Sequence, residues 1–574
     1  MVYYLAVGGN DSNPGTADAP VATLNKAVSL LTRGGDELVI RPGRYVCQPI
    51  SGMPERDSWD EQVVIRAEKS GTVELVTPQS GNILAVRSCT VVRGLRFSGL
   101  YGITQYDYLN TPLHHVLIEQ CWFGCIAPYR TARGVFLIGD TDYITIRDCQ
   151  FDHCLSTPLV LGRPNDEDKW ATNILIERCV FAENGRTGNN EGVCIEGVRE
   201  GSTNGYIRDQ NIILRDCVSW GHGDAGYDVK TVATFDRCIA YDNNWGFKVW
   251  GEGTRLLNCL AHNNWETGFA LIAAKQEAWN CTSAANGKYA FRVYKQSHTN
   301  KLRNCIILGI IKSIRSDSYY SQMPDIDYCC WWVPNPTDIA YEPEHVYWNL
   351  PFANLQSKTN PHPSVPNIVF PQPGEHMVYA DPQLVDVDTF TGYPRPSSKS
   401  PARKAGLWMD FLVRDLSGCT RALGIPPDLG ALTSLASRSL MEAHSPDTYA
   451  TQVPRSASIV ITFVEPVVEK SAQQQFALVA NGDEIIRGAF EWPIPFRQMR
   501  FIPTRSLPAE ALCRVRLARG ILKQDGTVSL ATESFSFTTS DEPVVELSRP
   551  SGKAVPVDKT VRITFDSAMD QASV

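Results

Sequence analysis

The chain has 574 residues, of which 43% are hydrophobic, and a formal net charge of −8. This length predicts two or three domains rather than one, and no apolar run reaches the roughly 18 residues that a membrane-spanning helix needs. The acidic balance argues against a nucleic-acid or anionic-membrane binder, because either needs a basic face. The chain opens on the strand-like MVYYLAV without a secretory signal, so we expect a cytoplasmic protein or one whose export signal has been removed.

The first 45 residues predict the cap of a solenoid. They contain a strand, a Gly/Asn/Pro loop, a short amphipathic helix from Thr23 to Leu31 and a second strand, ELVIRPGRY. A solenoid without a cap exposes its hydrophobic cross-section, so a helix of this kind is expected at its open end. The segments NPGT (13–16) and IRPGRY (40–45) resemble the opening of many bacterial right-handed parallel β-helix proteins.

From about Val46 to Leu308, short strands rich in β-branched residues alternate with polar turns, which predicts an all-β fold. A cysteine recurs in similar phrases such as RDCQF and ERCVF, and the later intervals between these cysteines are 21, 21, 22 and 24 residues. This period indicates stacked repeats, and one cysteine per turn indicates buried thiols that pack as small hydrophobes. Metal binding is the alternative, but CxxC and Cys/His pairing are absent. The cysteines are Cys121, Cys149, Cys179, Cys217, Cys238, Cys259, Cys281 and Cys305.

Between Gly192 and Tyr294 the pattern Gly-aromatic-X-aliphatic-X recurs five times with small departures, as GVCIE, GYDVK, GFKVW, GFALI and AFRVY. Stacked in register these segments form one sheet, and because side chains alternate between its faces, the aromatic and aliphatic positions form the core. The outward positions form two columns, which we predict to be the active surface. They are Cys194, Asp228, Lys248, Ala270 and Arg292 in one column and Glu196, Lys230, Trp250, Ile272 and Tyr294 in the next.

Longer spacings on the early turns predict loops, including Arg163–Thr172 and Arg199–Asp209, that wall a groove. Residues 312–367 are rich in Pro, Tyr and Trp and predict an excursion over the last turns. We expect a right-handed parallel β-helix domain over residues 1–435, followed by a Ser-rich linker over 436–449.

After the linker, VPRSASIVITFVEPV and VPVDKTVRITFDSAM repeat at an interval of 102 residues, about the length of one immunoglobulin-like sandwich. Both resemble bacterial Ig-like modules. We therefore expect an Ig-like β-sandwich over residues 450–541 and the start of a second, truncated repeat over 542–574, which makes the chain a fragment of a longer protein.

The outward columns combine charged and aromatic residues. Adjacent parallel strands lie about 4.8 Å apart, which places Asp228 and Lys248 within ion-pairing reach. Aromatic rings such as Trp250 and Tyr294 offer an apolar face to a sugar, and Arg292 offers a planar fork to a carboxylate. These residue types predict a site for an acidic polysaccharide. Abstracting the proton beside a uronate carboxylate needs a base, which a lysine can be if neighbouring cations or burial lower its pKa. It also needs a positive group such as Ca²⁺ or arginine.

Two motifs in this region, DAGYD at 224–228 and GFK at 246–248, resemble those of the pectate lyases of polysaccharide lyase family nine. That family is a right-handed β-helix with a D-D-G-F-D motif whose Asp residues bind Ca²⁺ and a G-F-K motif whose Lys is the base. The resemblance implies that Asp224 and Asp228 are calcium ligands and that Lys248 is the base. The sequence departs from the family at Ala225, and Lys230 puts a cation beside the metal that could replace it.

The leading hypothesis is a secreted or cell-surface lyase, acting as a monomer, that cleaves a pectin-like uronate polysaccharide by β-elimination. The third acidic metal ligand is Glu196 or Glu191, and we place Glu196 in the set. The predicted catalytic residues are Lys248, Arg292 and Asp228; the substrate-binding residues are Trp250, Lys230, Tyr294 and Glu196; and the Ca²⁺ ligands are Asp224, Asp228 and Glu196.

Three alternatives stay open. A glycoside hydrolase on the same scaffold would use Glu196 and Asp228 as its carboxylate pair. A C5-epimerase would share the first step of the lyase. A non-catalytic carbohydrate-binding surface protein would use the same columns with the Asp228–Lys248 and Glu196–Lys230 pairs as ordinary cross-turn salt bridges. His222 is expected to be an exposed turn histidine.

Overall fold

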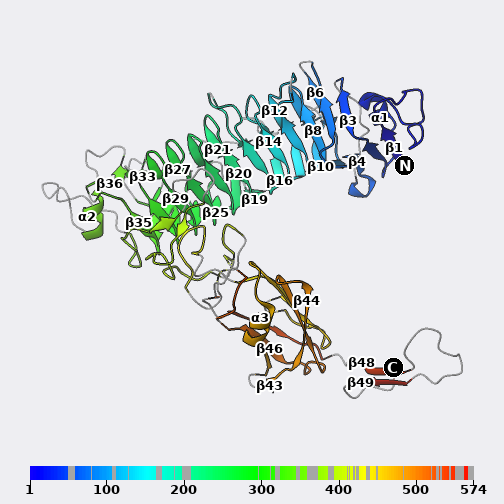
Figure 1. Cartoon of the computed structure of the whole chain (residues 1–574). Helices are drawn as coiled ribbons and strands as arrows, with labels where there is room; N and C mark the ends of the chain where they lie inside the picture. Colours follow the sequence, from blue (N-terminus) through cyan, green and yellow to red (C-terminus); the bar gives the residue numbers. More distant parts are fainter. Residues whose placement is uncertain are drawn as a thin grey trace. The chain divides into compact units, whose positions relative to one another are not determined.

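The structure is a computed structural model, and it describes most of the chain (Figure 1). The described residues are 1–48, 58–78, 81–105, 111–126, 128–162, 171–186, 188–196, 209–294, 297–309, 312–316, 323–335, 337–343, 350–357, 373–385, 393–409, 411–412, 414–417, 421, 426–434, 440–447, 450–481, 484–518, 520–524, 529, 533–541, 545–549 and 562–565. The predicted loops fall almost entirely outside these ranges, since 163–170 and 197–208 are not among them.

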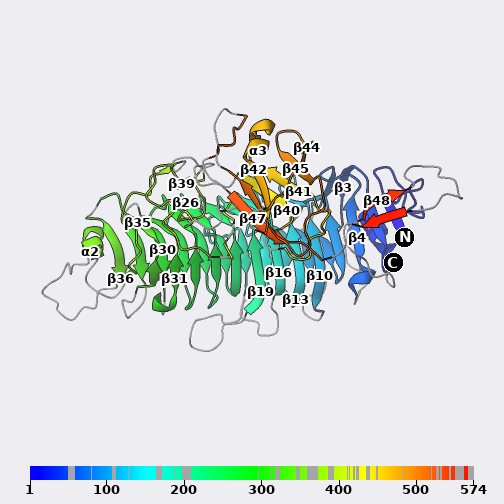
Figure 2. The same cartoon turned by 90° about the horizontal axis from the view of Figure 1, so that it is seen from below.

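The N-terminal part is a parallel β-helix, as predicted. Successive turns of the solenoid add strands to three long sheets, which we name A, B and C. Neighbouring strands of each sheet pair in parallel, except the last strand of sheet C, which pairs antiparallel. Figure 2 shows the successive strands of sheet A, such as β10 (Leu113–Glu119), β13 (Thr141–Arg147), β16 (Ala171–Glu177) and β19 (Asp209–Arg215), side by side along the solenoid.

Sheet A has 13 strands: β1 (Val2–Leu5), β2 (Glu37–Ile40), β4 (Val63–Ala67), β7 (Thr90–Arg93), β10 (Leu113–Glu119), β13 (Thr141–Arg147), β16 (Ala171–Glu177), β19 (Asp209–Arg215), β22 (Val232–Asp236), β25 (Arg255–Leu257), β28 (Glu277–Trp279), β31 (Lys301–Arg303) and β34 (Asp325–Asp327). Sheet B has 12: β3 (Gly43–Val46), β5 (Val73–Val76), β8 (Leu95–Ser98), β11 (Trp122–Gly124), β14 (Gln150–Asp152), β17 (Val180–Ala182), β20 (Val218–Trp220), β23 (Ile239–Tyr241), β26 (Leu260–His262), β29 (Thr282–Ala284), β32 (Ile306–Leu308) and β35 (Cys330–Trp332). Sheet C has 12: β6 (Asn82–Val86), β9 (Tyr101–Gln105), β12 (Arg133–Leu137), β15 (Leu159–Leu161), β18 (Val193–Ile195), β21 (Ala225–Val229), β24 (Trp245–Val249), β27 (Thr267–Leu271), β30 (Tyr289–Val293), β33 (Lys312–Ser316), β36 (Ile339–Pro343) and β37 (Leu350–Pro351).

The solenoid continues past the point that the sequence indicates. Strands β33 and β36 extend sheet C by parallel pairing, and β34 and β35 extend sheets A and B. The prediction of an excursion over residues 312–367 is therefore wrong for 312–316, 325–327, 330–332 and 339–343. The Pro, Tyr and Trp content of these segments makes the alternation of strand residues hard to recognise in the sequence. Some of the aromatic residues occupy inward positions in the solenoid, as Trp331 does.

The aromatic residues of the repeated segments stack inside the solenoid. Tyr227, Phe247, Phe269 and Phe291 are register partners on β21, β24, β27 and β30, and all are fully buried. The ring centroids of Phe247 and Phe269 lie 4.9 Å apart with an interplanar angle of 12°. The predicted register of these segments is confirmed.

The cysteine column is also inside. All eight predicted ladder cysteines are buried and free, and each thiol lies near the backbone carbonyl two residues earlier, as Cys217 Sγ does at 3.2 Å from Arg215 O. The interpretation as small buried hydrophobes is confirmed. Cys329 extends the same column, since its Sγ accepts from the backbone N–H of Cys305 and lies 3.2 Å from Asp327 O.

A ladder of buried asparagines fills the turns between sheets B and C. The Asn264 side chain accepts at Oδ1 from the backbone N–H of Asn243 at 3.2 Å and donates through Nδ2 to Asn286 Oδ1 at 2.9 Å. Each amide thus satisfies backbone groups of the neighbouring turn, which a buried turn requires.

The first turn carries the predicted cap. Helix α1 (Leu24–Ser29) starts after Thr23, whose side chain accepts from the backbone N–H of Lys26, and it buries Leu24, Ala27 and Val28. Figure 1 places α1 at the N-terminal end of the solenoid. The other helices in the described ranges are η1 (Trp59–Glu61), η3 (Ser297–Thr299), α2 (Phe352–Ser357) and α3 (Glu469–Gln475), and none of these helices is long and apolar enough to cross a membrane.

The chain divides into two compact units, Met1–Leu407 with Asp428–Leu432, and Trp408–Pro427 with Thr433–Val574. The first also holds the hairpin of β38 (Leu384–Val385) and β39 (Arg395–Pro396). The second contains two antiparallel four-stranded sheets around a common core, an Ig-like arrangement. One sheet is β40 (Met441–Ser445), β41 (Ile459–Phe463), β45 (Gln498–Pro503) and β44 (Gly488–Ile494); the other is β43 (Glu484–Ile485), β42 (Phe476–Ala480), β46 (Leu512–Leu517) and β47 (Glu533–Thr538).

Part of the predicted linker belongs to this Ig-like unit. Residues 441–445 form β40, which pairs with β41, so the sandwich begins before residue 450. The predicted second repeat contributes one hairpin, β48 (Val545–Arg549) with β49 (Arg562–Phe565), and the rest of 542–574 lies outside the described residues. The predicted domain boundaries stay predictions.

Replacing Phe269 with Ala should destabilise the solenoid by about 3–5 kcal/mol, because it opens a cavity between two stacked rings. Urea unfolding followed by circular dichroism measures the effect. The control Leu155→Ala, in the same unit but with a side chain 53% exposed, should stay within about 0.5 kcal/mol of the parent chain. Equal losses in both variants would contradict the stacked core.

Candidate active site

The outward face of sheet C brings Asp228 and Lys248 together. They are register partners on β21 and β24, and Lys248 Nζ lies 3.6 Å from Asp228 Oδ2. Lys248 Nζ also donates to Oδ2 of Asp224, in the turn before β21, at 2.8 Å. The prediction that these charges lie side by side on the outside of the sheet is confirmed, while their roles stay a prediction.

Three carboxylates converge beside this lysine. Glu191, in the turn before β18, lies with Asp224 and Asp228 so that one oxygen of each is within 4.8 Å of the others. Glu191 is fixed by Thr157, whose Oγ1 donates to Glu191 Oε2 at 2.6 Å. Such a group of oxygens could hold a metal ion.

Glu196 lies outside this carboxylate group, although it was placed in the predicted metal set. Its Oε1 accepts from Lys230 Nζ at 2.8 Å, and the same Nζ lies 3.9 Å from Asp228 Oδ2. The reason is the turn geometry, because Glu196 follows β18 at the end nearer Lys230, whereas Glu191 precedes β18 at the end nearer Asp224. Glu191 is therefore the third carboxylate of the group.

Asp228 is the centre of the cluster. It is 2% exposed, it lies within 4 Å of both lysine ammonium groups, and its Oδ1 accepts from Trp250 Nε1 at 2.7 Å. The indole N–H of Trp250 is therefore committed to positioning Asp228, and only its ring can contact a ligand.

The cluster holds more carboxylates than ammonium groups, namely Glu191, Glu196, Asp224 and Asp228 against Lys230 and Lys248. Burial works against the charged form of Lys248, but Asp228, Asp224 and Glu191 outweigh it and raise the pKa of Lys248. Burial raises the pKa of Asp228 despite its two lysines. Burial also raises the pKa of Glu191, and Asp228 and Asp224 add to that effect. An added cation would relieve this excess of negative charge.

Arg292 lies two strands further along sheet C than Lys248. Its guanidinium carbon is 5.0 Å from the ring centroids of both Trp245 and Tyr294, and Nη1 lies 3.2 Å from Glu266 Oε1. The predicted residues Arg292 and Tyr294 therefore contact each other at the same surface as Lys248.

Trp245 is a site residue that the sequence pattern does not single out. Its ring centroid lies 5.8 Å from Lys248 Nζ, so the indole lies between the two cations of this face. The motif Asn-Asn-Trp, which occurs at both Trp245 and Trp265, is the signal that could have identified it.

The prediction that His222 is an exposed turn residue is wrong. Its side chain is fully buried, its Nδ1 lies 3.0 Å from Asn184 O, and burial lowers its pKa to about 4. The ring folds back against Gly192, where an added Cβ would lie 2.6 Å from His222 Nε2. Gly192 thus makes room for the imidazole.

Comparison with known families gives two matches. The sequence model of the Pel9A-like, right-handed β-helix region matches residues 3–301, and that of a bacterial Ig-like domain matches residues 440–539. No curated protein matches the chain.

Similar solved structures include a rhamnogalacturonan lyase, with 18% identity over 65% of this chain and 97% of that chain, TM-score 0.34. The A-module of the Azotobacter vinelandii mannuronan C-5 epimerase AlgE4 has 14% identity over 60% of this chain and 98% of that one, TM-score 0.38. Mycobacterium tuberculosis L,D-transpeptidase 1 has 21% identity over 18% of this chain, TM-score 0.13, and the match spans only 38% of the transpeptidase.

Replacing Glu191 with Gln should stabilise the chain at neutral pH in the presence of EDTA. Because the pKa of Glu191 is higher in the folded chain than in the unfolded one, ionising it opposes folding. The free-energy cost of ionising Glu191 is absent below the pKa that Glu191 has in the unfolded chain, and it is complete above the pKa that it has in the folded chain. The difference in melting temperature between variant and parent should therefore grow as the pH rises from the first value to the second. Thermal unfolding between pH 4 and pH 8 measures it, and a difference independent of pH would contradict the assignment.

Proposed function

Because this chain belongs to the Pel9A-like right-handed β-helix family, we propose that it is a lyase that cleaves a uronate-containing, pectin-like polysaccharide by β-elimination. The observation that carries the proposal is Lys248, a half-buried amine held between two carboxylates on the outer face of sheet C, with an arginine and three aromatic rings along the same face.

Lys248 is the proposed base. Its Nζ takes the proton from C5 of the uronate, and the electron pair of the C–H bond forms the C4–C5 double bond. The C4–O bond breaks, its electron pair stays on the oxygen of the leaving sugar, and a water molecule protonates that oxygen. The amine must be unprotonated to accept that proton, whereas Asp228, Asp224 and Glu191 raise its pKa and favour the ammonium form. A cation bound by these carboxylates would offset that effect and favour the neutral amine. Asp224 and Asp228 hold Lys248 in place and, by favouring its ammonium form, keep the proton after transfer.

The carboxylate group fits Ca²⁺, which prefers several oxygen ligands. Glu191, Asp224 and Asp228 would hold the ion, and its charge matches the excess of carboxylates over ammonium groups in the cluster. When bound, Ca²⁺ supplies positive charge that offsets these carboxylates and the negative charge that develops on the substrate.

Arg292 is proposed to bind a substrate carboxylate through its planar guanidinium. Trp245 and Tyr294 hold that guanidinium between their rings, and Glu266 accepts from it. The ring of Trp250 is proposed to stack on a sugar, and Lys230, bridging Glu196 and Asp228, adds positive charge to the same subsite.

The substrate and the domain organisation suggest where the protein works. Polysaccharides of this kind lie outside cells, and an Ig-like domain following a catalytic domain is a common spacer, so we propose a secreted or surface-bound enzyme. A polysaccharide is its proposed partner, and a monomeric state stays a prediction.

The hydrolase alternative is less well supported. It requires Glu196 and Asp228 to act as an acid and a base or nucleophile, but Lys230 Nζ lies 2.8 Å from Glu196 and 3.9 Å from Asp228, so one ammonium bridges the pair. A C5-epimerase would use Lys248 as the lyase does, and it differs only in returning a proton instead of breaking the C4–O bond.

Replacing Lys248 with Ala should lower the rate on polygalacturonate by about 10²–10⁴-fold, the range of a lost general base. Ultraviolet absorbance of the unsaturated product and reducing ends measure it together. The control Lys275→Ala, whose side chain is 69% exposed, should keep the parent rate. Reducing ends without ultraviolet absorbance would indicate a hydrolase, and neither signal on any uronate polymer would contradict an enzyme of this class.

Calcium should raise the melting temperature of the parent chain, and EDTA should reverse the rise. At a hundred times the dissociation constant, binding adds about 2.7 kcal/mol to the free energy of unfolding. Glu191→Gln should abolish most of this gain and Glu196→Gln should keep it, because Glu196 lies with Lys230. The reverse pattern would favour Glu196 as the ligand.

A further inference from the structure

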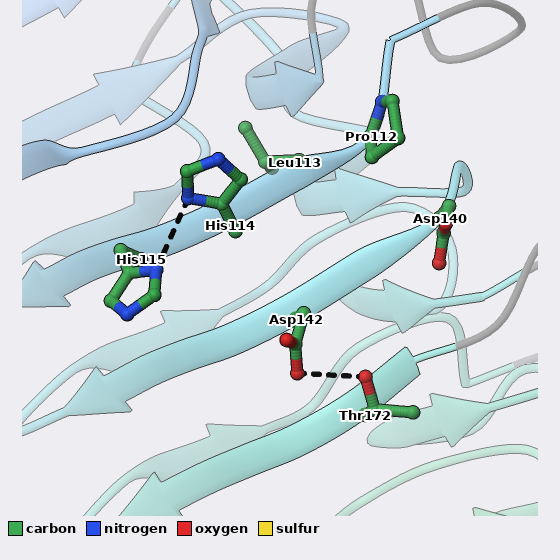
Figure 3. A pocket seen from close by; sticks show the side chains of 7 residues that line it. All are labelled: Pro112, Leu113, His114, His115, Asp140, Asp142 and Thr172. Atoms are coloured by element: carbon green, nitrogen blue, oxygen red, sulfur yellow. Dashed lines mark hydrogen bonds between the residues drawn. The ribbon is translucent and has the colours of Figure 1, made fainter. Parts of the chain in front are cut away.

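A pocket of about 500 Å³ lies on the outer face of sheet A, away from the sheet that carries Lys248. It crosses three neighbouring strands, β10, β13 and β16, and Figure 3 shows its lining side chains from close by. The lining residues are Pro112, Leu113, His114, His115, Asp140, Asp142 and Thr172.

The polar groups of the pocket are of mixed kinds. His114 and Asp142 are register partners, as are Asp142 and Thr172, so imidazole, carboxylate and hydroxyl follow one another across three strands. Asp142 Oδ1 accepts from Thr172 Oγ1 at 2.8 Å and from Asn173 Nδ2 at 2.7 Å. Figure 3 shows the second oxygen of Asp142 on the side away from Thr172, where a ligand could donate to it.

The two histidines are held by each other. The Nδ1 atoms of His114 and His115 lie 3.1 Å apart, one donating to the other, which leaves both Nε2 atoms without a partner in the part of the chain that the structure describes. The His115 ring also stacks on Tyr143, with centroids 4.8 Å apart. Tyr143 is thereby fixed although 53% of it is exposed.

The backbone at Tyr143 is left-handed, as it is at the equivalent position of the neighbouring turns. His115, Tyr143, Asn173 and Asn211 occupy the same position of successive strands, all with φ between 50° and 54°. Asparagine tolerates this left-handed conformation, whereas a bulky aromatic residue is strained there. The fold is therefore served better by Asn at this position, and a strained, half-exposed tyrosine beside a pocket points to a function other than stability.

The spacing of these groups excludes a simple metal site. Across the described ranges, Glu191, Asp224 and Asp228 are the one set of three acidic, cysteine or histidine side chains with ligand atoms within 4.8 Å of one another. The imidazoles and carboxylates of the pocket are spread more widely. Groups that donate and accept, distributed over a pocket with an exposed aromatic ring at its edge, suit a ligand with several hydroxyl groups.

We propose that this pocket binds a neutral sugar residue of a polysaccharide. Asp140 and Asp142 disfavour a uronate there, because a second carboxylate would meet like charge. The carboxylate and imidazole groups bond the sugar hydroxyls, and the Tyr143 ring packs on the sugar's apolar face. The site differs from the lyase site in its sheet and in its charge, so it does not depend on the activity proposed for Lys248.

The test uses the full chain and affinity gel electrophoresis with soluble galactan, arabinan or xyloglucan in the gel, and polygalacturonate as the charged comparison. At least one neutral polymer should retard the parent chain. Tyr143→Asn and His114→Ala should each weaken this binding by about tenfold or more. Tyr143→Asn should also melt at or above the parent temperature, because Asn suits the left-handed backbone.

The matched control is Tyr328→Asn, which makes the same change at another left-handed tyrosine (φ 52°), on a distant turn. It should keep the parent's binding. Retardation by no neutral polymer, or unchanged retardation of Tyr143→Asn, would overturn the proposal. Tyr143→Asn and His114→Ala should both form unsaturated product from polygalacturonate at the parent rate. Gel retardation measures binding without turnover, so the test of the pocket is valid even if the chain is not a lyase.

Discussion

The fixed register between successive turns is the constraint on which this structure depends. Strands of successive turns pair in parallel, so each residue lies between the residues at the same position of the turns before and after it. Inside, this produces ladders of rings, thiols and amides; outside, it sets Asp228 beside Lys248. A slip of one residue would exchange the two faces and bury both charges.

The rigid interior explains how the outer face can hold an unfavourable set of charges. Three other carboxylates and two ammonium groups surround the largely buried Asp228, and burial raises the pKa of both Asp228 and Glu191. Such a cluster opposes folding, and the packed ladders beneath it have to compensate. Functional sites commonly carry this kind of cost, because charged groups arranged for a ligand are poorly satisfied without it.

Positions at which a side chain differs from its equivalents on neighbouring turns identify the candidate sites. Where neighbouring turns place Asn173 and Asn211 in a left-handed position, the same column holds Tyr143 and His115. Where the outward column could hold small or neutral residues, as at Ala270, it holds Asp228, Lys248 and Arg292 instead. Both candidate sites lie where the side chains depart from what the solenoid needs, one on sheet C where carboxylates and lysines gather around Asp228, the other on sheet A where histidines, aspartates and a threonine line a pocket.

The sequence by itself determined the solenoid, the core columns and the pairing of Asp228 with Lys248, because strand alternation and a constant period fix direction and neighbour for every residue inside a repeat. Only the tertiary structure decided that Glu191 and not Glu196 joins Asp224, that His222 is buried, and that Trp245 lies between Lys248 and Arg292. These residues lie in turns or at strand ends, where alternation no longer fixes the direction of a side chain. Which group such a side chain contacts depends on distances between neighbouring turns, and the sequence alone does not give those distances.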